Sequence, residues 1–319
     1  MKNGNKTALN ILKKLLNGKG KSGNYVLALV VIVACAAVLI KAGVIPDFVG
    51  IGDIGGNDPA NSYVDSFEVH FIDVGQGDCT LVKCDGKTLL IDAGENGHEE
   101  KLATYLRSAG VDTLDFILCS HQHSDHMGGL PETVTEFGVK TVIMPRLTEK
   151  QTPTNKTYTA FLNAVKESGA SVKAAVPGDK YTLGSAEFEI LGPVSDDAED
   201  LNNMSAVMML TYKDKKFLFT GDAEKEEELE ILATDCDLKC DVLKVGHHGS
   251  KTSSSKEFLS AASPDICVIQ CGRDNDYGHP HKQALDRLKK YTSEIYRTDI
   301  CGDIVITCKD GELSVNYEG

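Results

Sequence analysis

The sequence predicts an α/β domain built from two layered β-sheets, preceded by one N-terminal transmembrane helix. Residues 25–45 form a long apolar run, the first strand-like segments after it are joined by tight turns, and later strand-like runs alternate with helical segments. Hairpins followed by alternating strands and helices are typical of two sheets with helices on their faces. Periodicity alone does not choose among the folds of this kind.

The apolar run at residues 25–45 is interrupted only by Lys41. As a helix it would span roughly 32 Å, about the thickness of a bilayer core. Six lysines lie in residues 1–24, so the positive-inside rule places this basic tail in the cytoplasm and the rest of the chain outside the cell membrane. We expect a single-pass signal anchor, with a cleaved signal peptide or a lipoprotein signal at Cys35 as the alternatives.

Residues 46–65 are rich in Gly, Asp, Asn and Pro, which predicts a flexible linker before a folded domain at residues 66–319. The whole chain carries 33 basic and 47 acidic residues, a net charge of −14. Its first 65 residues contain seven lysines and four aspartates, so the folded domain has a net charge of −17. This balance argues against a protein that coats nucleic acid through a basic surface.

The domain begins with segments typical of a hairpin and a helix. Asp85-Gly86 separates two β-rich runs and has the sequence of a type I′ turn. Helical spacing over His98–Ala109 stops at Gly110, and the apolar run Phe116–Ser120 follows. The three strands expected before that helix are Phe67–Ile72, Cys79–Cys84 and Lys87–Asp92.

Strand-like and helix-like segments then alternate to the end of the chain. Tyr212-Lys213-Asp214-Lys215 offers a second tight turn. Helices are expected at Tyr158–Ser168, Lys225–Ala233 and His281–Lys290. Strands are expected at Thr141–Met144, Lys180–Leu183, Ala186–Leu191, Ala206–Tyr212, Lys215–Thr220, Asp241–Val245, Ile266–Cys271, Ile304–Thr307 and Leu313–Tyr317.

The histidines carry the chemical information, because seven of the nine lie in three short clusters at 121–126, 247–248 and 279–281. The first cluster, HQHSDH, packs three imidazoles and one carboxylate directly after a predicted strand. A loop that leaves a strand end can point alternating side chains into one cavity. Imidazole and carboxylate together suit Zn²⁺ or Mn²⁺ and leave positions open for water.

Two more strand ends carry the same kinds of side chain. Asp222 follows the apolar strand Lys215–Phe219, and in isolation it would be interpreted as a helix N-cap. His247 and His248 follow the strand Asp241–Val245 and are flanked by glycines, which let the backbone approach closely. With the first cluster, these groups predict a metal site at the strand ends.

This order of motifs resembles the metallo-β-lactamase superfamily: HxHxDH, then a strand-terminal Asp, then a strand-terminal His. Five segments are similar to the hydrolase domain of ComEC-type competence proteins, namely FIDVGQGD (71–78), LIDAG (90–94), NNMS (202–205), LKVGHHGS (243–250) and YGHPH (277–281). The resemblance covers residues 66–319. It implies an αββα sandwich with a metal cleft at one edge, between the two sheets.

The resemblance also implies two divalent ions, Zn²⁺ or Mn²⁺, and their ligands. These are His121 and His123 for one ion, Asp125, His126 and His247 (or His248) for the other, and Asp222 as the bridge between them. Asp92, Asp78 and Asn203 would lie behind the ligands, with Asp92 orienting an imidazole and fixing its tautomer. Superfamily members usually add a histidine before the bridging Asp, and this chain has none from Met127 to Gly246. Water, a substrate oxygen or Asp78 would then complete the first site.

Two such ions hold a bridging hydroxide at neutral pH and clamp the entering and leaving oxygens. That machinery hydrolyses phosphodiesters, lactones, thioesters or β-lactams, and the resemblance implies a phosphodiesterase or nuclease. The expected catalytic residues are Asp125, Asp222 and His279. His279 or His281 would bind phosphate or protonate the leaving alkoxide. Further candidates for contact with an anionic substrate are Lys244, Lys251 and Arg273.

The acidic charge disfavours long DNA as the substrate, except at a local basic cleft. A DNA channel needs many membrane spans and this sequence predicts one, so the chain alone is not a translocation pore. The alternatives are a cell-surface phosphorylcholine esterase or lactonase, and a non-catalytic, membrane-tethered binding module. The intact HxHxDH motif argues against the binding module. The sequence does not set the oligomeric state.

Overall fold

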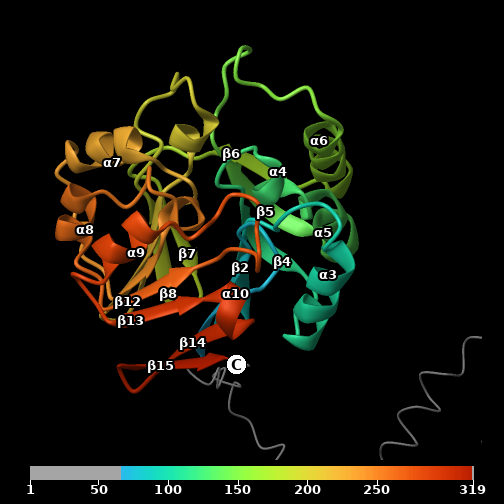
Figure 1. The fold of residues 1–319 in the computed structure, drawn as a ribbon. Coiled ribbons are helices and arrows are strands. Elements are labelled where there is room, and N and C mark those ends of the chain that lie inside the picture. Colours follow the sequence, from blue (N-terminus) through green and yellow to red (C-terminus); the bar gives the residue numbers. More distant parts are fainter. Residues whose placement is uncertain (1–65, 318–319) are drawn as a thin grey trace, which may run out of the picture. The chain divides into compact units, whose positions relative to one another are not determined.

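Two mixed β-sheets lie face to face in the computed structural model, which describes residues 66–317 (Figure 1). The first sheet holds, in spatial order, β15 (Glu312–Tyr317), β14 (Ile304–Lys309), β1 (Phe67–Phe71), β2 (Thr80–Cys84), β3 (Lys87–Ile91), β4 (Leu114–Leu118), β5 (Val139–Met144) and β6 (Ser171–Ala174). The second holds β13 (Glu294–Arg297), β12 (Ile266–Ile269), β11 (Val242–Lys244), β10 (Lys215–Phe219), β9 (Met208–Tyr212), β8 (Ala186–Ile190) and β7 (Lys180–Leu183). In each sheet one half is antiparallel and the other parallel.

Helices cover the outer face of each sheet, which confirms the αββα sandwich. The first sheet carries α3 (Glu99–Ser108), α5 (Leu130–Phe137) and α6 (Lys156–Ser168), and the second carries α7 (Lys225–Leu232), α8 (Lys256–Ala262) and α9 (Lys282–Leu288) (Figure 1). Neighbouring strand residues point to opposite layers, as the pleat requires. In β2, Leu81 packs under the helices, whereas Val82 packs against the facing sheet. In β10, Leu218 and Phe217 divide in the same way.

Aromatic side chains hold the two sheets together. Phe67 of β1 stacks on Tyr212 of β9, with ring centroids 4.3 Å apart and an interplanar angle of 8°. Phe71 and Phe219 repeat this contact nearer the other end of the strands, at 6.1 Å. All four rings are buried, and each joins the first sheet to the second. This core fixes how the strand ends of the two sheets face each other.

The predicted turns are confirmed. Asp85 and Gly86 both have positive φ, 50° and 74°, as a type I′ turn between β2 and β3 requires. Tyr212 pairs with Lys215 across the second hairpin. Six α-helices and strands of the described residues were not predicted: α4 (Ser124–Met127), α5, α8, α10 (Thr298–Cys301), β6 and β13. The two strands are short edge strands with exposed or half-exposed residues, so they lack the apolar run that marks an inner strand.

The predicted cytoplasmic tail (1–24), transmembrane anchor (25–45) and linker (46–65) lie outside the described residues. Within residues 66–317, no helix combines the length and the apolar character needed to cross a bilayer.

Helix α7 buries two consecutive carboxylates. Glu227 accepts a hydrogen bond of 3.0 Å from the backbone N–H of Val194, and its other oxygen, Oε2, has no partner. Burial raises the pKa of Glu227 from 4.5 to about 8. Glu228 accepts hydrogen bonds from the backbone of Ser254 and Ser255. Because the folded state holds the Glu227 proton more tightly than the unfolded chain, this group makes stability fall as pH rises from about 4.5 towards 8.

Glu227→Gln should remove this pH dependence, because the amide oxygen still accepts from Val194 and no charge is buried. We expect the free energy of unfolding of the variant to exceed that of the wild type by on the order of 1–2 kcal/mol at pH 8.5, and the two to converge near pH 4.5. Urea unfolding of both proteins in EDTA measures this. Glu226→Gln, a change at an exposed neighbour, is the control. An equal offset at both pH values would contradict the assignment.

Candidate metal centre

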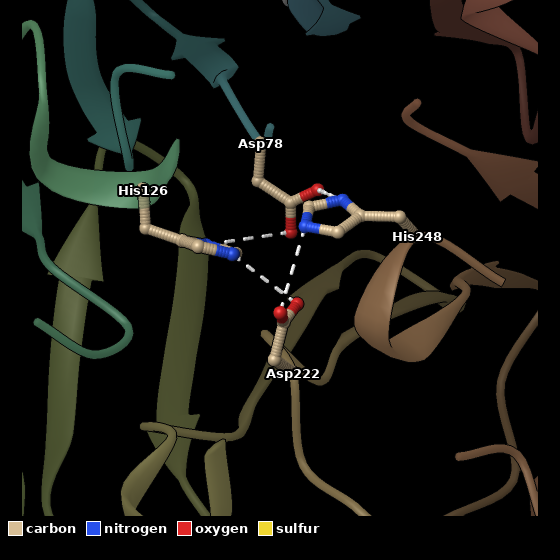
Figure 2. A group of neighbouring side chains, drawn as sticks. All are labelled: Asp78, His126, Asp222 and His248. Carbon is tan, nitrogen blue, oxygen red and sulfur yellow. Dashed lines mark ion pairs between the residues drawn. The ribbon is translucent and has the colours of Figure 1, made fainter. Parts of the chain in front are cut away.

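Four buried side chains, Asp78, His126, Asp222 and His248, converge on one point between the strand ends (Figure 2). One candidate donor atom from each lies within 4.8 Å of the others. Asp78 precedes β2 and His126 belongs to the short helix α4 (Ser124–Met127) after β4, so both come from the first sheet. Asp222 follows β10 and His248 follows β11, so both come from the second. The cluster therefore exists only where the two sheets meet.

Close backbone contact places Asp78. Gly77 has a φ of +129°, and a Cβ there would lie 2.1 Å from the carbonyl oxygen of Asp125, so the position requires glycine. The N–H of Asp78 donates to that same oxygen at 3.1 Å, and Gly94 N–H donates to Asp78 O at 2.8 Å. These contacts hold the loop before β2 against the loop that carries the HQHSDH motif. Asp78, expected either behind the ligands or as the group that completes the first site, lies within the cluster.

Asp92 orients His126, as the resemblance implied. Its carboxylate accepts from Ser120 N–H at 2.7 Å and from Ser120 Oγ at 2.5 Å, and it lies 2.8 Å from His126 Nδ1. Nδ1 is therefore the donor, and Nε2 presents its lone pair to Asp222 Oδ1 at 3.2 Å. Neither His126 Nε2 nor Asp222 Oδ1 has a hydrogen-bond partner, although both are buried. Two facing acceptors of this kind are satisfied by a cation between them or by a proton on His126 Nε2.

His248 has the same arrangement from the other side. Its Nδ1 lies 2.9 Å from Gln270 O and donates to it, which leaves Nε2 3.2 Å from Asp125 Oδ2 and 3.5 Å from Asp222 Oδ2. His247 and His248 both have positive φ, 48° and 52°, and this tight turn aims His248 inward. His247 Nδ1 instead contacts Glu224 at 3.1 Å, with its Nε2 3.8 Å from Asp222 Oδ2. Of the two histidines left open by the sequence, His248 is the one in the cluster.

The electrostatics of the cluster favour positive charge at both imidazoles. Burial alone would lower their pKa, but Asp222 and its neighbours raise the pKa of His248 to about 10 and that of His126 well above its usual value. Despite burial, the same imidazoles hold the pKa of Asp222 well below the usual range, and that of Asp125 is lowered too. A divalent ion satisfies the same field with both histidines neutral. The donor set therefore fits a metal ion.

Lys244 lies behind Asp78 and not in the cavity. Its side chain is buried, its ammonium contacts Asp78 Oδ2, and Nζ lies 3.4 Å from Gly221 O. Lys251 and Arg273, the other cations expected to contact substrate, are exposed, and neither lines the cavity above the cluster. Lys244 therefore acts on Asp78, where it offsets one buried negative charge.

His121 and His123 form a second, less enclosed group beside the cluster. His121 Nε2 lies 3.0 Å from His123 Nδ1, and the rings of His121 and His126 are 4.1 Å apart. Burial and the nearby His126 lower the pKa of His121 well below its usual value, which keeps it neutral. Asn203 accepts from Glu224 N–H at 3.0 Å and so positions the start of α7.

A cavity of about 330 Å³ opens over the cluster. Asp125, Asn202, Tyr277 and His279 line it, together with His123, His247 and the two second-sheet cluster residues. The His279 ring lies 6.0 Å from that of His248, and its Nδ1 is buried without a partner. His281 does not line the cavity.

Gln270 supports the site but was not among the residues predicted for it. Its Nε2 donates to Ile72 O at 3.2 Å and to Cys79 O at 2.7 Å, and its Oε1 accepts from Thr80 Oγ1 at 2.9 Å. Its backbone carbonyl accepts from His248. One residue thus ties the loop that carries Asp78 to the histidine on the other sheet. A glutamine in the apolar run ICVIQC (266–271) is the signal that would have marked it.

The sandwich fold and the buried Asp/His cluster define a metallo-β-lactamase-type hydrolase. The model of the metallo-beta-lactamase superfamily matches residues 72–273, and the chain belongs to that superfamily. ComE operon protein 3 of Bacillus subtilis is 32% identical over 268 residues, covering 78% of this chain and 34% of that protein. Recombination protein 2 of Haemophilus influenzae is 31% identical over 256 residues, covering 78% and 30%. The ComEC-type resemblance is confirmed, and the chain spans about a third of the length of these relatives.

Among solved structures, CmlA, a diiron β-hydroxylase from Streptomyces venezuelae, is similar with a TM-score of 0.50 and 14% identity. The match covers 73% of this chain and 53% of CmlA. At this identity the likeness shows the shared fold alone.

Gln270→Leu should weaken metal binding, because it removes three hydrogen bonds that hold the Asp78 loop and keeps the side-chain bulk. We expect affinity for Zn²⁺ or Mn²⁺ to fall by about 10–100-fold, the usual effect of losing support behind a ligand. Competition with a chromophoric chelator measures it. Thr80→Val removes only one of these bonds and should have a smaller effect. Lower thermal stability with unchanged metal affinity would show that Gln270 is merely structural.

Proposed function

We propose that this chain is a membrane-anchored, dinuclear metal-dependent phosphodiesterase. The observation that carries the proposal is the facing of His126 Nε2 and His248 Nε2 towards Asp222, beneath an open cavity. The relatives named for competence and recombination support a substrate that contains phosphodiester bonds. The alternative remains a phosphorylcholine esterase or lactonase.

The chain offers two sets of ligands for Zn²⁺ or Mn²⁺. The inner set is Asp78, Asp125, His126, Asp222 and His248, and the outer set is His121 and His123 with Asp222 shared. Bound divalent ions would lower the pKa of a water and offset charge on the phosphoryl oxygens. We expect the inner set to bind more tightly, because it is buried and its imidazoles are already oriented by Asp92 and Gln270.

His279 is suited to holding a substrate oxygen. Burial and the neighbouring His248 and His247 lower its pKa to about 4, so its ring is neutral at pH 7. A neutral imidazole offers one N–H donor and no spare proton. We therefore assign it to orienting the phosphate, and not to protonating the leaving group.

We also propose that residues 25–45 anchor the chain in the cell membrane with the hydrolase domain outside. The apolar length of the run and the lysines before it support this topology. Protease added to intact cells should degrade the domain. Protection of the domain until the cells are lysed would contradict the proposed orientation.

Asp222→Ala should abolish hydrolysis, because among the described residues Asp222 is the carboxylate that faces Nε2 of both inner-set imidazoles. We expect at least about a hundredfold loss of kcat/KM on a bis-aryl phosphate. Metal content should fall from close to two ions per chain towards one or none. Asp237→Ala, at an exposed surface ion pair, is the control. Intact activity in the Asp222 variant would overturn the bridging assignment.

Removal of metal with EDTA should stop hydrolysis, and added Zn²⁺ or Mn²⁺ should restore it. The restored protein is then assayed in parallel on single-stranded DNA, a phosphorylcholine ester and a β-lactam. Cleavage of the DNA supports the phosphodiesterase. Cleavage of the ester alone would replace it with the esterase alternative.

A further inference from the structure

Tyr277 presents a large ring to water at the mouth of the cavity. It is 64% exposed and yet lines the same cavity as Asp125 and Asp222. An exposed aromatic ring beside a buried polar site marks a surface that binds a ligand, since the ring gains by being covered. Tyr277 has no part in the proposed metal binding or hydrolysis, so a different role must account for its exposed position at the cavity.

A series of rings leads from Tyr277 down to the metal cluster. Tyr277 stacks on His279 with centroids 5.7 Å apart and an angle of 18°. His279 lies 6.0 Å from His248, and His248 lies 5.1 Å from His126. One face of Tyr277 is thus taken by His279. The ligand that stacks on Tyr277 would therefore lie one ring away from a group that faces the cluster.

The loop that carries Tyr277 is held in place by a side chain. Asn275 Nδ2 donates to Gly272 O at 2.9 Å and to His279 O at 2.6 Å, and Asn275 Oδ1 accepts from His279 N–H at 3.0 Å. Gln76 Oε1 in turn accepts from Gly272 N–H at 3.1 Å. Because the loop backbone is already ordered, less entropy is lost when a ligand stacks on the ring that the loop carries.

We propose that Tyr277 is a stacking platform for an unpaired nucleobase next to the scissile phosphate. The inference rests on the proposed phosphodiesterase function and names its substrate class as a single-stranded nucleotide chain. A single open aromatic face suits a planar heterocycle, whereas a quaternary ammonium is bound by aromatic cages. Bases inside a duplex are already stacked and paired, so they do not reach this ring.

The test compares thymidylyl-thymidine with an analogue in which one of the two sugars carries no base. The abasic sugar is placed on each side of the phosphate in turn. Products are separated by chromatography, so no aromatic leaving group interferes. For the full chain, Tyr277→Ala should lower the ratio of kcat/KM between the two substrates by about tenfold. Tyr277→Phe should keep the wild-type ratio.

Tyr317→Ala is the matched control, because Tyr317 is also exposed and its ring lies beside another, that of Tyr296, with centroids 5.8 Å apart. It should leave the ratio unchanged. Equal losses on both substrates in Tyr277→Ala, or a loss in Tyr277→Phe as large as in Tyr277→Ala, would overturn the stacking assignment.

A second measurement separates this inference from the proposed function. The chain contains no tryptophan, so Tyr277→Trp introduces a single tryptophan at the platform, whose fluorescence can be excited apart from that of the tyrosines. After metal removal with EDTA, thymidine 5′-monophosphate should quench its fluorescence, and deoxyribose 5-phosphate should not. Equal responses to the two would overturn the platform. If the wild type cleaves neither dinucleotide while selective quenching is seen, the platform stands and the phosphodiesterase proposal fails.

Discussion

The carboxylate of Asp222 facing two imidazole nitrogens is the interaction on which the rest of the structure depends. His126 Nε2 and His248 Nε2 approach it at 3.2 and 3.5 Å, and each imidazole is fixed from behind, by Asp92 or by the Gln270 carbonyl. Because Nδ1 is the donor in both rings, the two Nε2 lone pairs point at a negative group. A divalent cation relieves that contact with both imidazoles neutral, and protonation of the imidazoles relieves it in the absence of one. The histidines come from opposite sheets on either side of it, so the sheets must be packed accurately for the site to exist.

Close backbone contacts and unfavourable backbone conformations in the loops hold this geometry. Gly77 brings the Asp78 loop into contact with the Asp125 carbonyl, and the turn that aims His248 contains two consecutive residues with positive φ. At these two residues, His247 and His248, which are not glycine, backbone with positive φ costs on the order of 1–3 kcal/mol per residue. The inter-sheet core supplies the compensating stability through buried pairs such as Phe67 and Tyr212. The two histidines follow each other in a strand-end loop of the site.

The sequence predicted most of the chemistry, because the histidine motif and Asp222 follow apolar strands and strand ends are visible in a sequence. The sequence did not show whether His247 or His248 belongs to the cluster. The backbone conformation between the two flanking glycines decides which imidazole points inward, and no sequence pattern specifies it. Lys244 was expected to contact substrate, yet it is the last residue of a buried strand, and its direction is set by the pleat of that strand. Edge strands such as β6 were not predicted, because exposed strands lack an apolar pattern. The two-sheet layering followed from the hairpins and the alternation, but the αββα arrangement required the resemblance.

The acidity of the domain and the chemistry of its cavity both favour a short unpaired nucleotide strand as the substrate. No lysine or arginine is among the side chains that line the cavity in residues 66–317, and His279 is neutral at pH 7. Under the proposed function, phosphate would be held by cations at the cluster and by the neutral His279 donor, and the ligand carboxylates contribute to the net charge of −17. Such a surface repels a long duplex, whose affinity depends on many phosphate contacts at once. The short unpaired strand that we propose as substrate would make few of them and would gain instead from stacking, so the acidity of the domain disfavours duplex DNA without excluding a nucleotide strand.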